Sequence, residues 1–425
     1  MDIGANTATM QFPDPPMPTR ASASQPLSFH RYLPITAFYF FFNCAGLPSG
    51  MYFTGIFSPL LYFWLYARGQ RWVTTKFFLV LSPFILAHEL LGIASVYYYL
   101  RSLALLWTVY IAVYAICLAL SHTHNLERLF RELIVLNFFA TIIALVVFPT
   151  PLRPLFWRSD PIAVIGVSHL YRLNLLSIEP SEYALLMLPL LIYASLRLMR
   201  SGNLTNAVYL FCVVVPLLFT QSFGGISMGL AGIGVAFAGN YRRFLKRPTA
   251  LIFLLLLIAV IGSLALIHNP ISERILQVVN GSDSSTRSRT IFSFIAAYVV
   301  ASSKSLLWGV GLGQIKLYDF TGLGLGFTAN IIPNDIAGTF AELGIIAVAL
   351  KIAVEIYLFF RMKVYLNSFR LAMFVIAFIT QFTGSFLTDV QEYIMWFLAF
   401  YPLFPHLDLF NDPVVKGTAS RSRGA

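Results

Sequence analysis

Long runs of apolar residues, separated by short polar connectors, fill most of this chain. Residues 133–149 and 251–267 contain no charged side chain, and each run is near the roughly 20 residues that cross a bilayer as a helix. Such runs exclude the alternating strands of an outer-membrane barrel. The pattern predicts about a dozen transmembrane helices, at residues 32–47, 51–66, 77–99, 102–120, 133–149, 181–196, 205–220, 222–239, 250–267, 336–360, 371–387 and 392–406.

The predicted fold class is therefore all-α, a polytopic membrane protein with one transmembrane domain at residues 29–410. Residues 1–28 and 411–425 are expected to be cytosolic tails, the first of them disordered. The first tail lacks a basic start followed directly by an apolar stretch, so a cleaved signal peptide is not expected.

Composition agrees with this class. Hydrophobic residues make up 58% of the chain and charged residues 11%, against roughly 25% charged in a soluble domain. Cys44, Cys117 and Cys212 lie in apolar segments without C-x-x-C spacing, which predicts neither a disulfide framework nor a metal site. The net charge of +11 comes from basic residues dispersed among short connectors, so it indicates membrane topology and not nucleic-acid binding.

The distribution of basic residues predicts an orientation. Most of the 29 Lys and Arg residues fall in connectors on one side of the predicted domain, which the positive-inside rule makes the cytosolic side, with both termini. The outer side carries two long connectors, at about residues 150–180 and 268–335, and these hold every outward basic residue except Arg101. Residues 291–301 of the second connector are expected to form an amphipathic helix along the membrane surface.

Three polar islands interrupt the apolar pattern, at residues 172–182, 287–313 and 334–344. The outward arginines of the first two suit an anionic lipid headgroup, above all a diphosphate, because a guanidinium group is always charged and makes bidentate hydrogen bonds to phosphate. For Arg287 and Arg289, binding of ordinary anionic phospholipid, or pairing with Asp and Glu, is an equally weighted alternative.

The carboxylates of the islands have structural explanations as well as chemical ones. Glu179 precedes Pro180 at an expected helix start and could sit beside Arg172. Asp335 is most simply the N-terminal cap of a long helix, whereas Glu342 lies about two turns inside and needs a partner or a wet cavity. The glycines at 309–313 predict a tight turn and not a nucleotide site, and Gly322, Gly324 and Gly326 could extend it as a loop over a cavity.

Other polar residues in apolar segments are expected to satisfy one another. His88 and Glu89 form either a proton relay or a mutually satisfied pair. Lys351 and Glu355 have i,i+4 spacing, which predicts that they neutralise each other. Asp389 and Glu392 either line the same outer vestibule or form a solvated turn, and Gly225-x-x-x-Gly229 indicates helix packing.

The ordered series Arg172…Glu179-Pro180-Ser181, Arg287/Arg289…309–313 and Asn334-Asp335…Glu342-Leu343-Gly344 resembles the Wzy polysaccharide polymerases and the related O-antigen ligases. The resemblance covers about residues 165–360 and looks closest to exopolysaccharide polymerases of the xanthan type. It implies a GT-C glycosyltransferase of the bacterial inner membrane that acts on the periplasmic face without a cofactor or metal. The donor would be a glycan on undecaprenyl pyrophosphate and the acceptor a lipid-linked repeat unit, with chain-length and export proteins as further partners.

The resemblance also implies roles for individual residues. Arg172, Arg287 and Arg289 match the family's outward arginines and would hold the pyrophosphates. Related ligases commonly carry a histidine where this chain has Pro333, which favours a polymerase and leaves the general base open among Glu179, Asp335 and Glu342, with His169 and His268 also outward and activation by arginine alone as another possibility. The predicted substrate-binding residues are Arg153, Arg158, His169 and Asn334.

Two other function classes fit the same layout. A flippase or transporter of lipid-linked oligosaccharides would also have many spans and a cationic cavity, although no internal repeat is evident. A structural subunit of a polysaccharide export assembly is the third hypothesis. Chain growth by the purified protein separates the polymerase from both.

Overall fold

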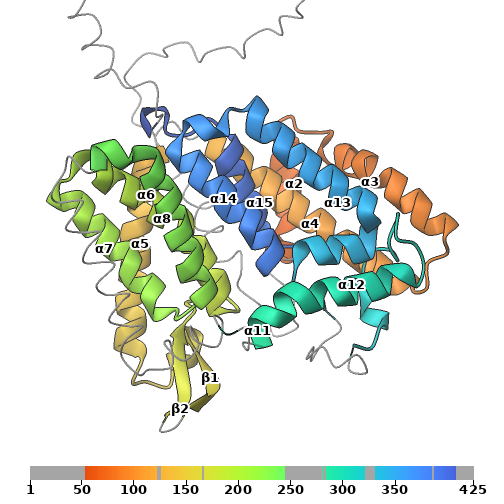
Figure 1. The fold of residues 1–425 in the computed structure, drawn as a ribbon, viewed down its shortest axis with the longest axis horizontal. Coiled ribbons are helices and arrows are strands. Elements are labelled where there is room, and N and C mark those ends of the chain that lie inside the picture. The colour runs from red at the N-terminus through yellow and green to blue at the C-terminus, as the bar shows by residue number, and fades with distance from the viewer. Residues whose placement is uncertain are drawn as a thin grey trace, which may run out of the picture.

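The computed structural model describes residues 53–121, 126–164, 167–244, 280, 284–320, 331–384 and 387–407, and for 160–164, 167–170, 239–244 and 284–285 the description covers the backbone only. The predicted spans 32–47 and 250–267, both predicted tails, His268 and the glycines at 322–326 lie outside the described residues. The mainly helical class is confirmed for the described part (Figure 1). The helices are α2 (Phe53–Ala67), α3 (Val73–Leu90), α4 (Val96–Ser121), α5 (Leu126–Val147), α6 (Pro180–Ser201), α7 (Leu204–Phe219), α8 (Phe223–Phe244), α11 (Ser284–Arg287), α12 (Ser293–Ser302), α13 (Asp335–Arg361), α14 (Ser368–Thr383) and α15 (Val390–Phe400).

Within this part of the chain, 5 helices are long and apolar enough to cross a membrane: α3, α4, α5, α6 and α13. The expected span 77–99 is wrong as a single helix, because it is divided between α3 and α4. Helix α3 ends at Leu90, and Gly92 takes a left-handed φ of 77° in the turn before α4. An apolar sequence continues across this turn, so hydropathy alone did not reveal it.

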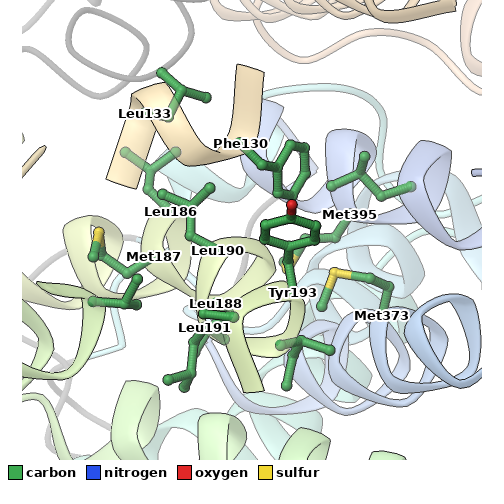
Figure 2. Close-up of a cluster of buried hydrophobic side chains, with 14 of the residues drawn as sticks. Phe130, Leu133, Leu186, Met187, Leu188, Leu190, Leu191, Tyr193, Met373 and Met395 are labelled. Carbon is green, nitrogen blue, oxygen red and sulfur yellow. The ribbon is translucent and has the colours of Figure 1, made fainter. Parts of the chain in front are cut away.

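Helix α6 lies at the centre of the largest core cluster, and it is apolar on nearly every side. Met187, Leu190 and Tyr193 pack among side chains from α5, α14 and α15, including Phe130 and Met373 (Figure 2). Helix α8 approaches α6 closely because a side chain at its glycines would collide with α6, as the surroundings of Gly225, Gly229 and Gly232 show. The predicted packing role of Gly225 and Gly229 is confirmed.

A β-hairpin, which the sequence analysis did not predict, follows α5. Strands β1 (Trp157–Val164) and β2 (Val167–Leu173) are antiparallel, with Trp157 opposite Leu173 and Arg158 opposite Arg172. The indole of Trp157 is buried and donates to the carbonyl of Ala144 at the end of α5, 2.8 Å away. The hairpin is thereby fixed to the end of the helical bundle (Figure 1).

Helix α13 is broken at Gly344, which has φ 79° and ψ 179°. The backbone of residues 306–311 fills the break: the carbonyls of Leu306 and Leu307 accept from Ile345 and Ile346, and Val310 donates to Ala341. The expected span 336–360 therefore corresponds to α13, but it is not one continuous helix, because the backbone turns at Gly344. Residues 335–343 lie instead beside α12, across the direction of the second part of α13 (Figure 1).

Helix α12, preceded by a π-turn at Ser288–Phe292, confirms the helix expected at 291–301. It is not amphipathic. Its buried face is formed by Ala296, Ala297 and Val300, and its exposed face is also apolar, with Ile295 and Tyr298. Both faces of this helix are therefore apolar, so the amphipathic character expected for residues 291–301 is wrong.

Candidate functional site

Parts of the three polar islands lie at one end of the bundle. The hairpin, the turn between α7 and α8, the π-turn and the first turns of α6, α13 and α15 lie there, and we call it the hairpin end (Figure 1). The side chain of Arg172 joins the hairpin to the α7–α8 turn, because its Nε donates to the carbonyl of Thr220 at 3.0 Å. Charged groups from all three islands are thus gathered in one region.

Two of the predicted arginines share one face of the hairpin. Arg158 and Arg172 are directly opposite in the strand register, so their side chains project to the same side. The expected partner of Glu179 was Arg172, but the structure pairs Glu179 with Arg158, at 3.7 Å between Oε1 and Nη1. Arg153 lies over the ring of Tyr171, 4.3 Å from its centroid, and supports the base of the hairpin.

The predicted pair of arginines in the second island diverges. Arg287 is exposed and its guanidinium lies over Phe292, 5.0 Å from the ring centroid. Arg289 lies against the end of α14, where a Cβ added to Gly384 would be 3.1 Å from its Nη1. Arg289 is therefore the arginine of this pair that faces the network described below.

Asn334 is fully buried and joins three segments. Its side-chain oxygen accepts from the N–H of Ala337, 2.9 Å away, which makes Asn334 the N-terminal cap of α13. Its amide nitrogen donates to the carbonyls of Arg289, at 2.8 Å, and Phe382, at 2.6 Å. The predicted cap Asp335 is therefore wrong, and the predicted substrate-binding residue Asn334 is enclosed by protein backbone.

Asp335 belongs to a buried ion cluster. Lys351 contacts the carboxylates of Asp335 and Glu392, both 1% exposed, and lies 3.0 Å from Glu392 Oε1. Trp396 also donates to Glu392, at 3.3 Å. The expected Lys351–Glu355 pair is wrong, because Glu355 instead accepts from Gln381 at 3.0 Å. The solvated turn considered for Glu392 is wrong too.

Two further carboxylates complete the site: Glu182 from the first polar island, to which the sequence analysis gave no role, and Asp389, for which it considered a place in this vestibule. Glu182, in the first turn of α6, is acted on by the negative charges of Asp389 and Glu179 and by the positive charge of Arg158. Asp389 precedes α15 and accepts from the N–H of Gln391 at 2.9 Å. Burial raises the pKa of the Asp389 carboxyl to about 6, and the charge of Asp335 acts in the same direction. The hairpin end therefore holds several carboxylates as well as arginines.

The structure places Glu342 in a different group. Its Oε1 accepts from the N–H of Gly313 at 3.0 Å, within the buried turn of residues 309–313. Beside this turn the ring of His88 bonds to the hydroxyl of Tyr99 and the carbonyl of Trp308, so the expected His88–Glu89 pair is wrong. The tight turn predicted for 309–313 is confirmed, and Glu342 supports it.

His169 lies in β2 opposite Pro161, and its side chain is outside the described part. Among the described residues no group of three or more His, Cys, Asp or Glu side chains could hold a metal ion. What the hairpin end offers is guanidinium groups for a polyanion, with carboxylates near enough to take up a proton. No protein-family model matches the chain, and no curated protein is significantly similar to it.

Proposed function

We propose that this protein is a membrane glycosyltransferase that joins oligosaccharide repeat units carried on a lipid diphosphate, as a Wzy-type polysaccharide polymerase does. The carrying observation is the convergence of Arg158, Arg172 and Arg289 at one end of an apolar helical bundle. A lipid-linked diphosphate would fit this arrangement. Its charged diphosphate lies at the surface of the bilayer, where the arginines are proposed to be, and its apolar chain lies in the hydrocarbon beside the helices.

The proposed setting is the bacterial inner membrane, with about 12 spans, a GT-C fold and the hairpin end on the periplasmic side. A membrane location is supported by the 5 long apolar helices of the described part. The periplasmic placement is supported by the basic residues of the short connectors, which predict that the opposite end is cytosolic. Donor and acceptor would both be undecaprenyl-pyrophosphate-linked glycans.

In the proposed reaction a hydroxyl of the acceptor sugar attacks the anomeric carbon of the donor glycan. The new glycosidic C–O bond forms as the bond from that carbon to the diphosphate oxygen breaks, and the lipid diphosphate leaves with the bonding electrons. Arg172 and Arg289 would stabilise the charge that develops on this leaving group. The hydroxyl proton would pass to a carboxylate, for which Glu179 is the candidate, because its side chain is 44% exposed whereas Asp335 is enclosed with Lys351.

The test is chain growth by the purified protein in lipid vesicles supplied with lipid-diphosphate-linked repeat units. We expect longer glycans from the wild type, and a roughly 100-fold or greater loss of rate in Arg172→Ala and Arg289→Ala. Arg128→Ala is the matched control, since Arg128 is an exposed arginine paired with Glu132 on α5. Movement of substrate across the bilayer without chain growth would overturn the proposal in favour of a flippase.

A further inference from the structure

Lys351 connects parts of the chain that its sequence position does not bring together. In an unbroken helix, residues 335 and 351 would be about 24 Å apart along the axis. Lys351 nevertheless contacts Asp335, because α13 turns at Gly344 and its first part comes back toward the second. Through Glu392 the same ammonium group also holds the first turn of α15.

Burying the charges of this cluster costs free energy of hydration. Lys351 is 19% exposed and its two carboxylate partners are 1% exposed, so all three charges have lost most of their hydration. Apolar side chains of similar volume often stabilise an interior as well as a buried ion pair does. The charges instead favour one geometry. The ammonium group of Lys351 contacts both carboxylates only when the first part of α13, its second part and α15 are arranged as they are here.

The arrangement that Lys351 selects leads directly to Arg289. Asp335 follows Asn334, whose amide donates to the carbonyls of Arg289 and Phe382. Gly384, two residues after Phe382, leaves the space that the Arg289 guanidinium occupies. Both the backbone of Arg289 and the surface beside its guanidinium are therefore fixed by the residue next to the ion cluster.

We propose that Lys351 is a positioning residue that holds Arg289 where it meets the substrate's diphosphate. It would do so by clamping residues 335–343 against α15. This role rests on the proposed function, because Arg289 binds a diphosphate only if that function holds. A displacement of a catalytic group by about 1 Å is enough to cost roughly 100-fold in rate.

The kinetic test measures kcat/KM for chain growth on the lipid-diphosphate-linked repeat unit in the full-length reconstituted protein. Lys351→Met is expected to lower it by roughly 100-fold, and Lys351→Arg to restore most of it. Adding Lys351→Met to Arg289→Ala should cause little further loss, whereas adding it to Arg172→Ala should multiply the two losses. The matched control is Lys363→Met, an exposed lysine just beyond α13, which should behave as the wild type does.

A variant in which all three charges are removed distinguishes the positioning role of Lys351 from misfolding caused by an unpaired buried charge. Lys351→Met with Asp335→Asn and Glu392→Gln leaves no unpaired buried charge, and it should fold yet remain as impaired as Lys351→Met. Full activity in this variant, or losses that multiply with Arg289→Ala, would overturn the role of Lys351. An inactive wild type would instead overturn the proposed function.

The position of Arg289 can also be measured without activity. Ile291, two residues after Arg289 in the π-turn, and Leu176, before α6, are both exposed and can carry spin labels. In a cysteine-free background, Lys351→Met should broaden or shift the distance distribution between them, and Lys363→Met should not. An unchanged distribution in Lys351→Met would overturn the inference whatever the substrate of the protein is.

Discussion

Asp389 has a carboxyl group that the fold holds partly away from water, in the connector between α14 and α15. Burial raises its pKa to about 6, and the charge of Asp335 adds to this, while the hydrogen bond from the N–H of Gln391 opposes it. In the unfolded chain an aspartate has a pKa of about 3.9. Between these values the folded protein keeps a proton that the unfolded chain has lost.

We therefore predict that Asp389 makes the protein less stable as the pH rises from about 4 to about 6. The folded state binds more protons in this window, so the free energy of unfolding falls with pH, by at most roughly 1.4 kcal/mol per unit from this group. Asp389→Asn keeps the cap on Gln391 and removes the titration. Thermal unfolding in detergent across this range should show a smaller pH dependence for Asp389→Asn than for the wild type.

The control is Glu89→Gln, which alters an exposed carboxylate at the end of α3. It should retain the wild-type pH dependence. Equal slopes for wild type and Asp389→Asn would show that this carboxyl titrates as it does in the unfolded chain.

Individual arginines could be predicted from the sequence, but their partners could not. Arg172 and Arg289 do lie at the hairpin end, as the polar islands indicated. The pairing of Glu179 with Arg158 depends on strand register, and that of Lys351 with Asp335 on a break in a helix. Both are tertiary features that local spacing does not contain. Spacing along the chain therefore favoured Arg172 as the partner of Glu179 and Glu355 as the partner of Lys351.

At the scale of elements, the break in α13 is determined by backbone groups from another segment. The sequence predicted the apolar run, but one glycine in a helix costs only about 1 kcal/mol and does not by itself end it. The break forms because the carbonyls of Leu306 and Leu307 accept from the amides that follow Gly344. The hairpin was missed for a similar reason, since it is fixed by a tertiary contact, the hydrogen bond from Trp157 of β1 to the carbonyl of Ala144 in α5.

We predict that Gly344→Ala will destabilise the protein. At φ 79° and ψ 179° an alanine is strained, and its Cβ would overlap the carbonyl of Leu307. The strain alone is worth about 1–3 kcal/mol, so the overlap should take the loss of unfolding free energy above about 2 kcal/mol. Thermal unfolding in detergent measures it, and chain growth should fall as well because residues 335–343 are displaced.

Gly234→Ala is the matched control. Gly234 lies in α8, and no atom is within 4 Å of a Cβ added there. Alanine favours a helix over glycine by about 1 kcal/mol, so this variant should be as stable as the wild type or slightly more stable. A Gly344→Ala protein as stable as Gly234→Ala would mean that α13 is continuous.

The whole molecule has two different ends. Parts of the three islands lie at the hairpin end. At the opposite end Glu127 links two segments, because it contacts Arg197 of α6 and its Oε1 lies 3.1 Å from Nε2 of His406. The described parts of the two long connectors and of the short basic connectors therefore lie at opposite ends, the separation that the charge pattern predicted. Which end faces the cytosol is a separate question, and the positive-inside rule answers it with a testable orientation.

We predict that a cysteine at Thr150 will react with a membrane-impermeant maleimide added to cells with a permeable outer membrane, and that a cysteine at Thr205 will not. Thr150 is exposed between α5 and the hairpin, and Thr205 is exposed at the start of α7, at the opposite end. The background must have Cys44, Cys117 and Cys212 replaced. Opening the inner membrane with detergent should make Thr205→Cys reactive, which shows that its thiol is accessible. The reverse labelling would place the arginines in the cytosol, where a periplasmic polymerase could not use them.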